Sequence, residues 1–339
     1  MTPFRSSLVA AGLLAATATG ALAAQLEPTT QNFIDKLTAS KAPPIYTLTP
    51  DGARDVLHGA QSGAVAKPAA DIERRVLPVG PKGKVQVSIV RPHGVRTRLP
   101  VVMYYHGAGW VMGDATTHDR LVREIAVGVH AAVVFVDYDR SPENQFPVAI
   151  EEDYAATKYV AEHPQQFGVD AKRLAVAGDS VGGNMAAEVA LLAKERNGPA
   201  IRAQLLFYPV TDANFENGSY NEFANGPWLT KPAMKWFWDA YLPDVDKRTD
   251  PHASPLHASL DQLAGQPEAL VITDENDVLR DEGEAYARKL SQAGVKVTST
   301  RYNGTIHDFV MLNALAGTPA AQAAVAQGNA FLRHALNGG

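Results

Sequence analysis

The segment that most constrains this chain is Leu174–Gly183, which reads Leu-Ala-Val-Ala-Gly-Asp-Ser-Val-Gly-Gly. Its four leading residues are apolar and predict a buried strand, and the residues that follow (181–196) predict a helix. Between them lies the pattern Gly-x-Ser-x-Gly, whose glycines permit the sharp, strained turn that exposes a serine hydroxyl. The pattern is common by chance, so its position between strand and helix is what makes Ser180 a candidate nucleophile.

The rest of the chain alternates between short apolar runs and helical stretches, which indicates an α/β fold with a mainly parallel central sheet flanked by helices. The predicted strands are 85–90, 101–105, 132–136, 174–177, 205–208, 270–273 and 295–302. Two segments fall outside the alternation, about 25–65 and 211–255, and we expect them to form a helical cap. The expectation is therefore one α/β-hydrolase domain over residues 24–339.

The second cap segment contains an amphipathic helix that begins after Thr230. Four of its large side chains share one face by i, i+3, i+4, i+7 spacing, namely Met234, Phe237, Trp238 and Tyr241. Such a face is ordinarily explained by core packing, and the functional alternative is the wall of a substrate pocket. For that pocket we expect the bulky aromatic residues Trp110, Tyr208, Trp228, Phe237 and Trp238.

The N-terminal residues are typical of an export signal. Arg5 supplies the positive charge, an uncharged stretch follows, and Ala21-Leu22-Ala23 offers a small-x-small cleavage site. We therefore expect residues 1–23 to be a signal peptide, and the mature protein to be periplasmic or secreted, without stable membrane insertion. The alternative is a retained anchor, but the stretch is mostly Ala, Gly and Thr and has little membrane affinity.

Composition excludes several classes of function. The 339 residues carry a net charge of −5 and no long basic cluster, which argues against nucleic acid as a partner. The chain has no cysteine, so disulfides, thiolate catalysis and cysteine-ligated zinc are excluded. We expect neither a metal nor an organic cofactor.

A nucleophilic serine needs a base, and the base needs an orienting acid. In α/β-hydrolases these follow the nucleophile in the order Ser, acid, His, each at the carboxyl end of a strand. His307 follows the last predicted strand and fits this order, whereas His252 and His257 lie too early. Position alone leaves the acid open among Asp274, Glu275, Asp277 and Asp281.

A second element of the expected site follows the strand 101–105, where residues 106–110 read His-Gly-Ala-Gly-Trp. Small residues there let backbone N–H groups turn toward a developing alkoxide. We expect the oxyanion hole to be formed by Gly107, Ala108 and Gly109 together with Val181. His106 is expected to brace this loop through a hydrogen bond to the backbone.

From about residue 75 onward, the chain resembles the hormone-sensitive-lipase-like family of esterases, the bacterial family IV enzymes. Residues 106–110 resemble its H-G-G-G-W motif, 178–183 its G-D-S-A-G-G, and 138–143 (Tyr-Asp-Arg-Ser-Pro-Glu) its Y-R-L-A-P-E. Residues 277–283 match D-P-L-R-D-E-G, and 306–309 (Ile-His-Asp-Phe) resemble H-G-F. Since the first aspartate of D-P-L-R-D-E-G is the family's triad acid, the resemblance selects Asp277.

The resemblance also shows where this chain departs from the family. Ala108 replaces a glycine of the oxyanion loop, and Asp308 and Val278 replace a glycine and a proline near the base and the acid. None of these changes removes a catalytic atom.

The resemblance implies a serine carboxylesterase that acts on small-molecule esters with short to medium acyl chains. The pKa of its base, His307, is expected near 6.5 if the histidine is unperturbed. An amidase or peptidase using the same triad is the alternative within enzymes. A non-catalytic ligand-binding homologue is the alternative outside them, although such proteins lose the histidine that His307 supplies. An unpaired edge strand could support a homodimer.

Overall fold

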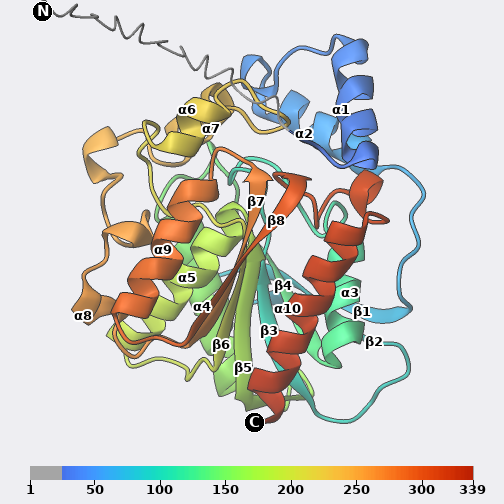
Figure 1. Ribbon diagram of the computed structural model, residues 1–339. Helices are drawn as coiled ribbons and strands as arrows, with labels where there is room; N and C mark the ends of the chain where they lie inside the picture. The colour runs from blue at the N-terminus through green and yellow to red at the C-terminus, as the bar shows by residue number, and fades with distance from the viewer. Residues whose placement is uncertain (1–24, 339) are drawn as a thin grey trace, which may run out of the picture.

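The computed structural model describes residues 25–338. Within them, one eight-stranded sheet has the strand order β1-β2-β4-β3-β5-β6-β7-β8 (Figure 1). β2 pairs antiparallel with both β1 and β4, and the other neighbours pair in parallel. The strands are β1 (Ala70–Leu77), β2 (Val85–Pro92), β3 (Leu99–Tyr105), β4 (Ala132–Asp137), β5 (Val169–Asp179), β6 (Ala203–Phe207), β7 (Glu268–Asn276) and β8 (Val297–Ile306).

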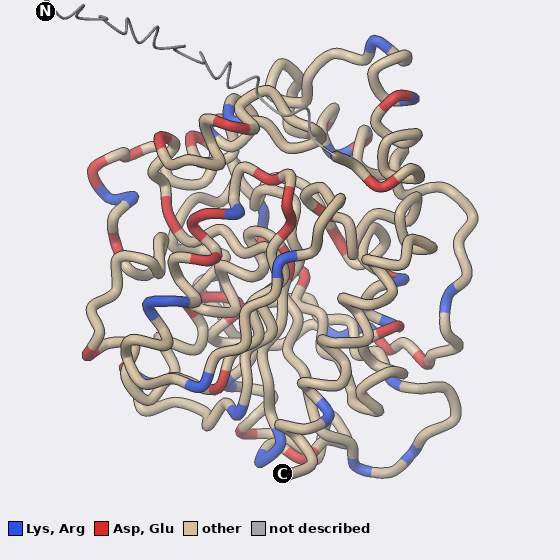
Figure 2. The backbone as a smooth tube through the Cα atoms, viewed as in Figure 1, with Lys and Arg blue, Asp and Glu red and all other residues tan. Residues whose placement is uncertain are grey.

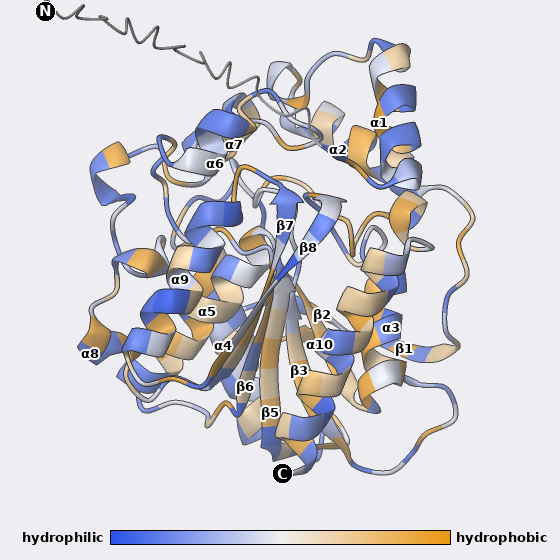
Figure 3. Cartoon of the chain, in the orientation of Figure 1, coloured by the Kyte–Doolittle hydropathy of each residue, from blue (hydrophilic) through white to orange (hydrophobic). Residues whose placement is uncertain are grey.

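Helices cover both faces of this sheet. α3 (Asp119–Val129) and α10 (Pro319–Asn337) pack together on one face, and α4 (Val148–Glu162), α5 (Val181–Glu195) and α9 (Arg280–Gln292) lie on the other (Figure 1). Because both faces are covered, the central strands contain long apolar runs (Figure 3), and every residue of β3 is buried. The sequence-based prediction of an α/β fold with a mainly parallel sheet is confirmed.

The two expected cap segments lie over the carboxyl ends of the strands (Figure 1). The first contains α1 (Pro28–Ser40), η1 (Ile45–Thr47) and α2 (Pro50–Gln61), and the second contains α6 (Gly218–Glu222) and α7 (Lys231–Tyr241). The remaining short helices are η2 (Val245–Lys247), η3 (Pro255–His257), α8 (Leu260–Leu263) and η4 (Asn313–Leu315). The two cap segments meet where η1 contacts α7.

Local sequence explains where the cap helices begin. The Thr49 hydroxyl accepts a hydrogen bond from the backbone N–H of Gly52 at 3.2 Å, and the Thr230 hydroxyl accepts one from Ala233, also at 3.2 Å. Each threonine is followed by proline within the first helical turn, where the missing N–H would have no intrahelical partner. The start of α7 after Thr230 agrees with the sequence-based prediction.

One arginine of the cap reaches down into the loops below it. The Arg54 guanidinium of α2 donates to the Val111 carbonyl at 2.8 Å and to both carboxylate oxygens of Glu143, each at 2.8 Å. It also donates to the Ser141 carbonyl at 3.1 Å. This fork of charge-assisted bonds fixes the first cap segment relative to the loops after β3 and β4.

β1 was missed by the sequence analysis, and its composition explains why. It is an edge strand that carries Asp71, Glu73, Arg74 and Arg75, so it lacks the apolar run used to find the other strands.

Charges of both signs are scattered over the described part of the chain (Figure 2). None of the described helices combines the length and the apolar character that crossing a bilayer requires. The expected signal peptide lies outside the described residues.

Candidate active site

Ser180 occupies the tight turn between β5 and α5. Its backbone angles, φ 55° and ψ −122°, lie where residues with a side chain are strained. The turn closes because its two glycines touch backbone: a Cβ on Gly178 would lie 2.2 Å from the Gly182 carbonyl oxygen, and a Cβ on Gly182 would lie 2.1 Å from that of Tyr105. The serine hydroxyl therefore sits above the sheet, at the positive end of α5.

The structure brings Ser180, His307 and Asp277 together in one hydrogen-bonded row. His307 Nε2 lies 2.9 Å from the Ser180 hydroxyl, and its Nδ1 lies 2.8 Å from Asp277 Oδ2. The second oxygen of Asp277 accepts the backbone N–H of Leu279 at 3.0 Å. All three side chains are buried, although they come from the ends of three different strands.

Two carboxylates flank the His307 ring. Burial by itself lowers the pKa of His307, but Asp277 and Asp308 outweigh it, and together they raise the pKa to about 9. Asp308 Oδ1 lies 3.6 Å from His307 Nε2, on the side that also faces Ser180. The sequence-based figure of 6.5 assumed no perturbation, and the structure replaces it with a more basic imidazole.

Asp308 also connects the catalytic loop to the cap. Its backbone φ is 67°, a region that suits the glycine found in the family motif. Its Oδ2 accepts the indole N–H of Trp228 at 2.8 Å, and its side chain is nearly buried. Sequence comparison marked Asp308 as a departure from the family, but only the structure shows its contact with Trp228.

The loop after β3 faces Ser180 from the other side. Within the described chain, the N–H groups of Ala108, Gly109 and Val181 have no hydrogen-bond acceptor. The N–H of Gly107 differs, since it donates to Asp179 Oδ1 at 3.1 Å. Of the four amides expected to form an oxyanion hole, three are therefore free to point at a ligand and Gly107 is engaged elsewhere. Ala108 adopts φ 81°, so its methyl group is held in a conformation that favours glycine.

Asp179, which sequence analysis did not single out, is the residue that holds this loop. It is fully buried and accepts the Tyr104 hydroxyl at 2.6 Å as well as the Gly107 amide. Its other oxygen lies 3.3 Å from His118 Nε2. Burial raises the pKa of Asp179, but His118 outweighs burial and lowers it. A buried charge of this kind persists only when it is well paired, as it is here.

His106 lies at the base of the same loop and is not part of the triad. Its Nδ1 lies 2.9 Å from the Gly107 carbonyl, and its ring stacks on Tyr138 with centroids 4.1 Å apart. Burial lowers the pKa of His106 to about 3, so the ring is neutral. These contacts agree with the expected bracing role.

A pocket of about 370 Å³ opens above Ser180 and His307. Its walls are mostly apolar and come from both cap segments and the oxyanion loop; they include Ile34, Leu37, Tyr46, Met112, Trp228 and Phe237. A volume of this size suits a small organic ligand.

Of the five aromatic residues expected in the pocket, Trp228 and Phe237 line it and the other three do not. Trp110 stacks on Tyr241 at a centroid distance of 4.0 Å, and Trp238 packs edge-on against Trp110. Both tryptophans are completely buried, so they belong to the core beneath the cap. Tyr208 is also buried, and its ring lies edge-on against His307 at 4.8 Å.

Among the described residues, one group brings three atoms of metal-binding type within 4.8 Å of one another, from Asp274, Asp277 and His307. The His307 nitrogen nearest Asp277 already faces that carboxylate at 2.8 Å. We therefore interpret these residues as acid–base groups and assign them no metal.

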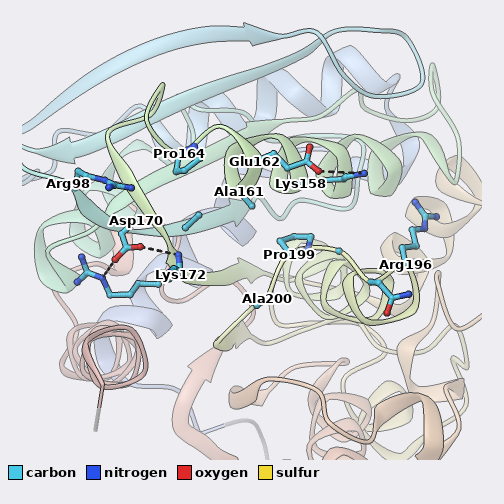
Figure 4. Close-up of a pocket in the computed structure, with 14 residues that line it drawn as sticks. Arg98, Lys158, Ala161, Glu162, Pro164, Asp170, Lys172, Arg196, Pro199 and Ala200 are labelled. Carbon is cyan, nitrogen blue, oxygen red and sulfur yellow. Dashed lines mark hydrogen bonds and ion pairs between the residues drawn. The ribbon is translucent and has the colours of Figure 1, made fainter.

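A larger hollow of about 880 Å³ lies at the opposite end of the sheet (Figure 4). It is open, and its charged lining comes from the amino ends of β3 and β5 and from the last turns of α4, including Arg98, Asp170, Lys172, Lys158 and Glu162. Lys158 and Glu162 form an exposed ion pair at 3.8 Å across one helical turn. Its lining contains none of the triad residues.

Comparison with known proteins agrees with this geometry. A family model described as alpha/beta hydrolase fold matches residues 102–311. A protein of Acanthamoeba polyphaga mimivirus described as an alpha/beta hydrolase is 44% identical over 295 residues, covering 87% of this chain and 84% of its own. Carboxylesterase NlhH of Mycobacterium tuberculosis is 39% identical over 272 residues, covering 80% of this chain and 84% of its own.

Solved structures share this fold as well. The crystal structure of a thermostable esterase from Pseudomonas putida ECU1011 superimposes with a TM-score of 0.90 at 52% sequence identity. The match covers 92% of this chain and 98% of that esterase.

Proposed function

The chain belongs to the alpha/beta hydrolase family, in its hormone-sensitive-lipase-like branch, and is a carboxylic ester hydrolase; we propose that it works through a Ser180–His307–Asp277 triad on esters of short to medium acyl chains. The observation that carries the proposal is the row of contacts from the Ser180 hydroxyl through His307 to Asp277, with distances of 2.9 and 2.8 Å. These distances suit a nucleophile, its general base and an orienting acid.

In the proposed reaction, Ser180 Oγ attacks the ester carbonyl while His307 Nε2 accepts the hydroxyl proton. Asp277 holds the Nδ1–H tautomer and stabilises the imidazolium that forms. His307 then protonates the leaving alkoxide oxygen, which releases the alcohol and leaves an acyl group on Ser180. Water repeats the same steps to release the carboxylic acid and restore the serine.

The negative charge of the tetrahedral intermediate needs donors that are already in place. We assign this role to the N–H groups of Ala108, Gly109 and Val181. They have no other acceptor in the described chain, and they come from the loop after β3 and from the residue that follows Ser180. Gly107 contributes indirectly, since its bond to Asp179 fixes the loop that presents the other amides.

The size and lining of the pocket support small, apolar acyl groups. With about 370 Å³ beside Ser180 and walls such as Leu37 and Phe237, the pocket has room for a short chain and offers it apolar contacts. The decisive test is a series of p-nitrophenyl esters from acetate to palmitate, measured as kcat/KM. We expect a maximum at or below octanoate. A maximum at palmitate would contradict the proposed chain length.

Matched ester and anilide substrates separate an esterase from an amidase on the same triad. We expect the ester to be hydrolysed and the matched anilide to show no hydrolysis above the rate without enzyme. Labelling by a fluorophosphonate probe that disappears in Ser180→Ala identifies the nucleophile directly.

We further propose that residues 1–23 direct export and are then removed. The proposal rests on the sequence pattern alone, with Arg5 before an uncharged stretch and Ala21-Leu22-Ala23 at its end. Cell fractionation with N-terminal sequencing of the mature protein tests it. We expect a periplasmic or secreted product that begins at Ala24 or Gln25, and a cytoplasmic product that retains Met1 or Thr2 would contradict it.

A further inference from the structure

A second aspartate lies behind the triad. Asp274, near the end of β7, is completely buried, and neither of its carboxyl oxygens has a hydrogen-bond donor among the described residues. One of its oxygens, one oxygen of Asp277 and one ring nitrogen of His307 all lie within 4.8 Å of one another. The triad as proposed above has no use for this carboxyl group.

The strand geometry explains how two carboxyl groups come so close. The β7–β8 ladder changes register between Asp274 and Asn276, and the Asn276 amide donates to the Thr305 carbonyl at 3.0 Å. Irregularities of this kind re-aim side chains beside active sites. Asp277 follows the end of β7 and contacts His307, while Asp274 lies within β7 three residues earlier.

Two buried carboxyl groups at this separation cannot both be charged at neutral pH without a strong penalty. Asp277 has the Leu279 N–H and His307 to stabilise its charge, whereas Asp274 has no donor. The other titratable groups that face Asp274 are Asp308 and the buried hydroxyl of Tyr208, and neither supplies a positive charge. Burial, helped by Asp277 and Asp308, raises the pKa of Asp274 well above its usual range.

Building on the proposed triad, we propose that Asp274 is a positioning residue held as a neutral carboxylic acid, with its O–H directed toward the Asp277 carboxylate. The pair then carries one negative charge. In this state the Asp274 O–H offsets part of the negative charge of Asp277, and it thereby limits how far Asp277 raises the pKa of His307. An ionised Asp274 would instead add a second negative charge beside His307. Close charges shift a pKa by roughly 1 to 3 pH units, so the pKa of His307 would rise further by about that amount.

The pH profile of kcat/KM for p-nitrophenyl acetate tests the proposal in three variants. Asp274→Asn keeps a neutral side chain with a donor, so we expect the midpoint of the acid limb to stay within about 0.3 pH units of wild type. Asp274→Ala removes the donor, so the charge of Asp277 acts on His307 without that offset, and the midpoint moves up by about 0.5 to 1 unit. Asp308→Asn is the matched control, because it removes a carboxylate on the other side of His307 and moves the midpoint down.

Two outcomes would overturn the proposal. A downward shift of one unit or more in both Asp274 variants would mean that Asp274 is charged in the resting enzyme. A midpoint that is unchanged in Asp274→Ala would mean that the side chain only fills space.

Infrared difference spectroscopy of wild type against Asp274→Asn, at neutral pH, gives a readout that does not depend on activity. The difference should contain the C=O stretch of a protonated carboxyl group, and carboxylate bands in its place would refute the assignment. Asp153→Asn serves as a control for the method, since Asp153 is another fully buried carboxyl far along the chain, in α4. If instead the triad itself were wrong, Ser180→Ala would keep its activity, whatever the infrared difference shows.

Discussion

The two ends of the central sheet carry hollows of opposite character. At the amino end, the open hollow of Figure 4 has more than twice the volume of the pocket at the carboxyl end, about 880 against 370 Å³. Its charged side chains are exposed and form local pairs such as Lys158–Glu162. At the carboxyl end, Ser180 has a strained backbone and Asp277 and His307 are buried.

The difference shows that volume is a poor guide to function in this fold. Exposed ion pairs contribute about 0 to 1 kcal/mol each and require little from the rest of the molecule. Strained backbone and buried charge instead persist only where surrounding structure holds them, and such features concentrate at functional sites. The following substitutions test this contrast.

Replacing the nucleophile should have the largest effect. In Ser180→Ala, no acyl-enzyme can form, so we expect kcat for p-nitrophenyl acetate to fall by a factor on the order of 10⁶. Steady-state assay with circular dichroism to verify folding measures this. Near-normal turnover would remove the functional distinction between the two hollows.

Replacing the orienting acid should have the next largest effect. Asp277→Asn keeps the size of the side chain but favours the wrong tautomer of His307, so we expect kcat to fall by about 10⁴-fold. Asp281→Asn is a suitable control, because Asp281 was an alternative acid in the sequence and contacts Arg280 and the backbone N–H of Ser219 instead of His307. A larger loss in Asp281→Asn than in Asp277→Asn would reassign the acid.

The pH profile of the wild-type enzyme should report the carboxylates around His307. The base works only when neutral, so activity is lost as pH falls through the pKa of His307, which the structure raises to about 9. Asp308→Asn removes one of the charges responsible, and we expect the acid limb to move down by about one unit, which increases kcat/KM at pH 7 by up to about tenfold. An acid limb at 6.5 in both proteins would show that these charges do not act on His307.

A change in the pocket wall should alter selectivity more than rate. Phe237 lines the pocket and packs against Gly109, so Phe237→Ala enlarges the space available to the acyl chain. We expect the ratio of kcat/KM for octanoate over acetate to rise by about fivefold. Trp238→Phe, in the core behind the pocket, should leave the ratio unchanged and lower only the thermal stability.

The smallest effect is expected in the larger hollow. The double variant Lys158→Ala and Glu162→Ala removes an exposed ion pair, so we expect activity within about 20% of wild type and a change in unfolding free energy below about 1 kcal/mol. Denaturant unfolding and the esterase assay measure both. A marked loss of activity would show that this end of the molecule also takes part in function.

The sequence predicted those parts of the site that depend on local geometry and chain order. The elbow around Ser180 follows from glycine spacing between a strand and a helix, and the position of His307 follows from the order of strands. The choice of Asp277 required the family motif, because Asp274, Glu275 and Asp281 fit the spacing equally well. The geometry shows what spacing could not, since Asp277 alone of these four hydrogen-bonds to His307.

The pocket was less predictable, because helical periodicity identifies a buried face without saying what covers it. Phe237 and Trp238 are neighbours in α7, yet Phe237 reaches the pocket and Trp238 packs on Trp110 in the core. Likewise, no local signal shows that the Gly107 amide binds Asp179, since those residues are brought together only by the pairing of β3 with β5. These features depend on tertiary contacts between distant segments.

The Arg54 fork carries an evolutionary consequence. Because one side chain of α2 binds the Val111 carbonyl and the Glu143 carboxylate at once, the first cap segment and the loops that frame the active site are constrained to diverge together. A chimaera that takes residues 25–65 from a relative will keep the contacts to Val111 and Glu143 only if the relative has an arginine at the position of Arg54.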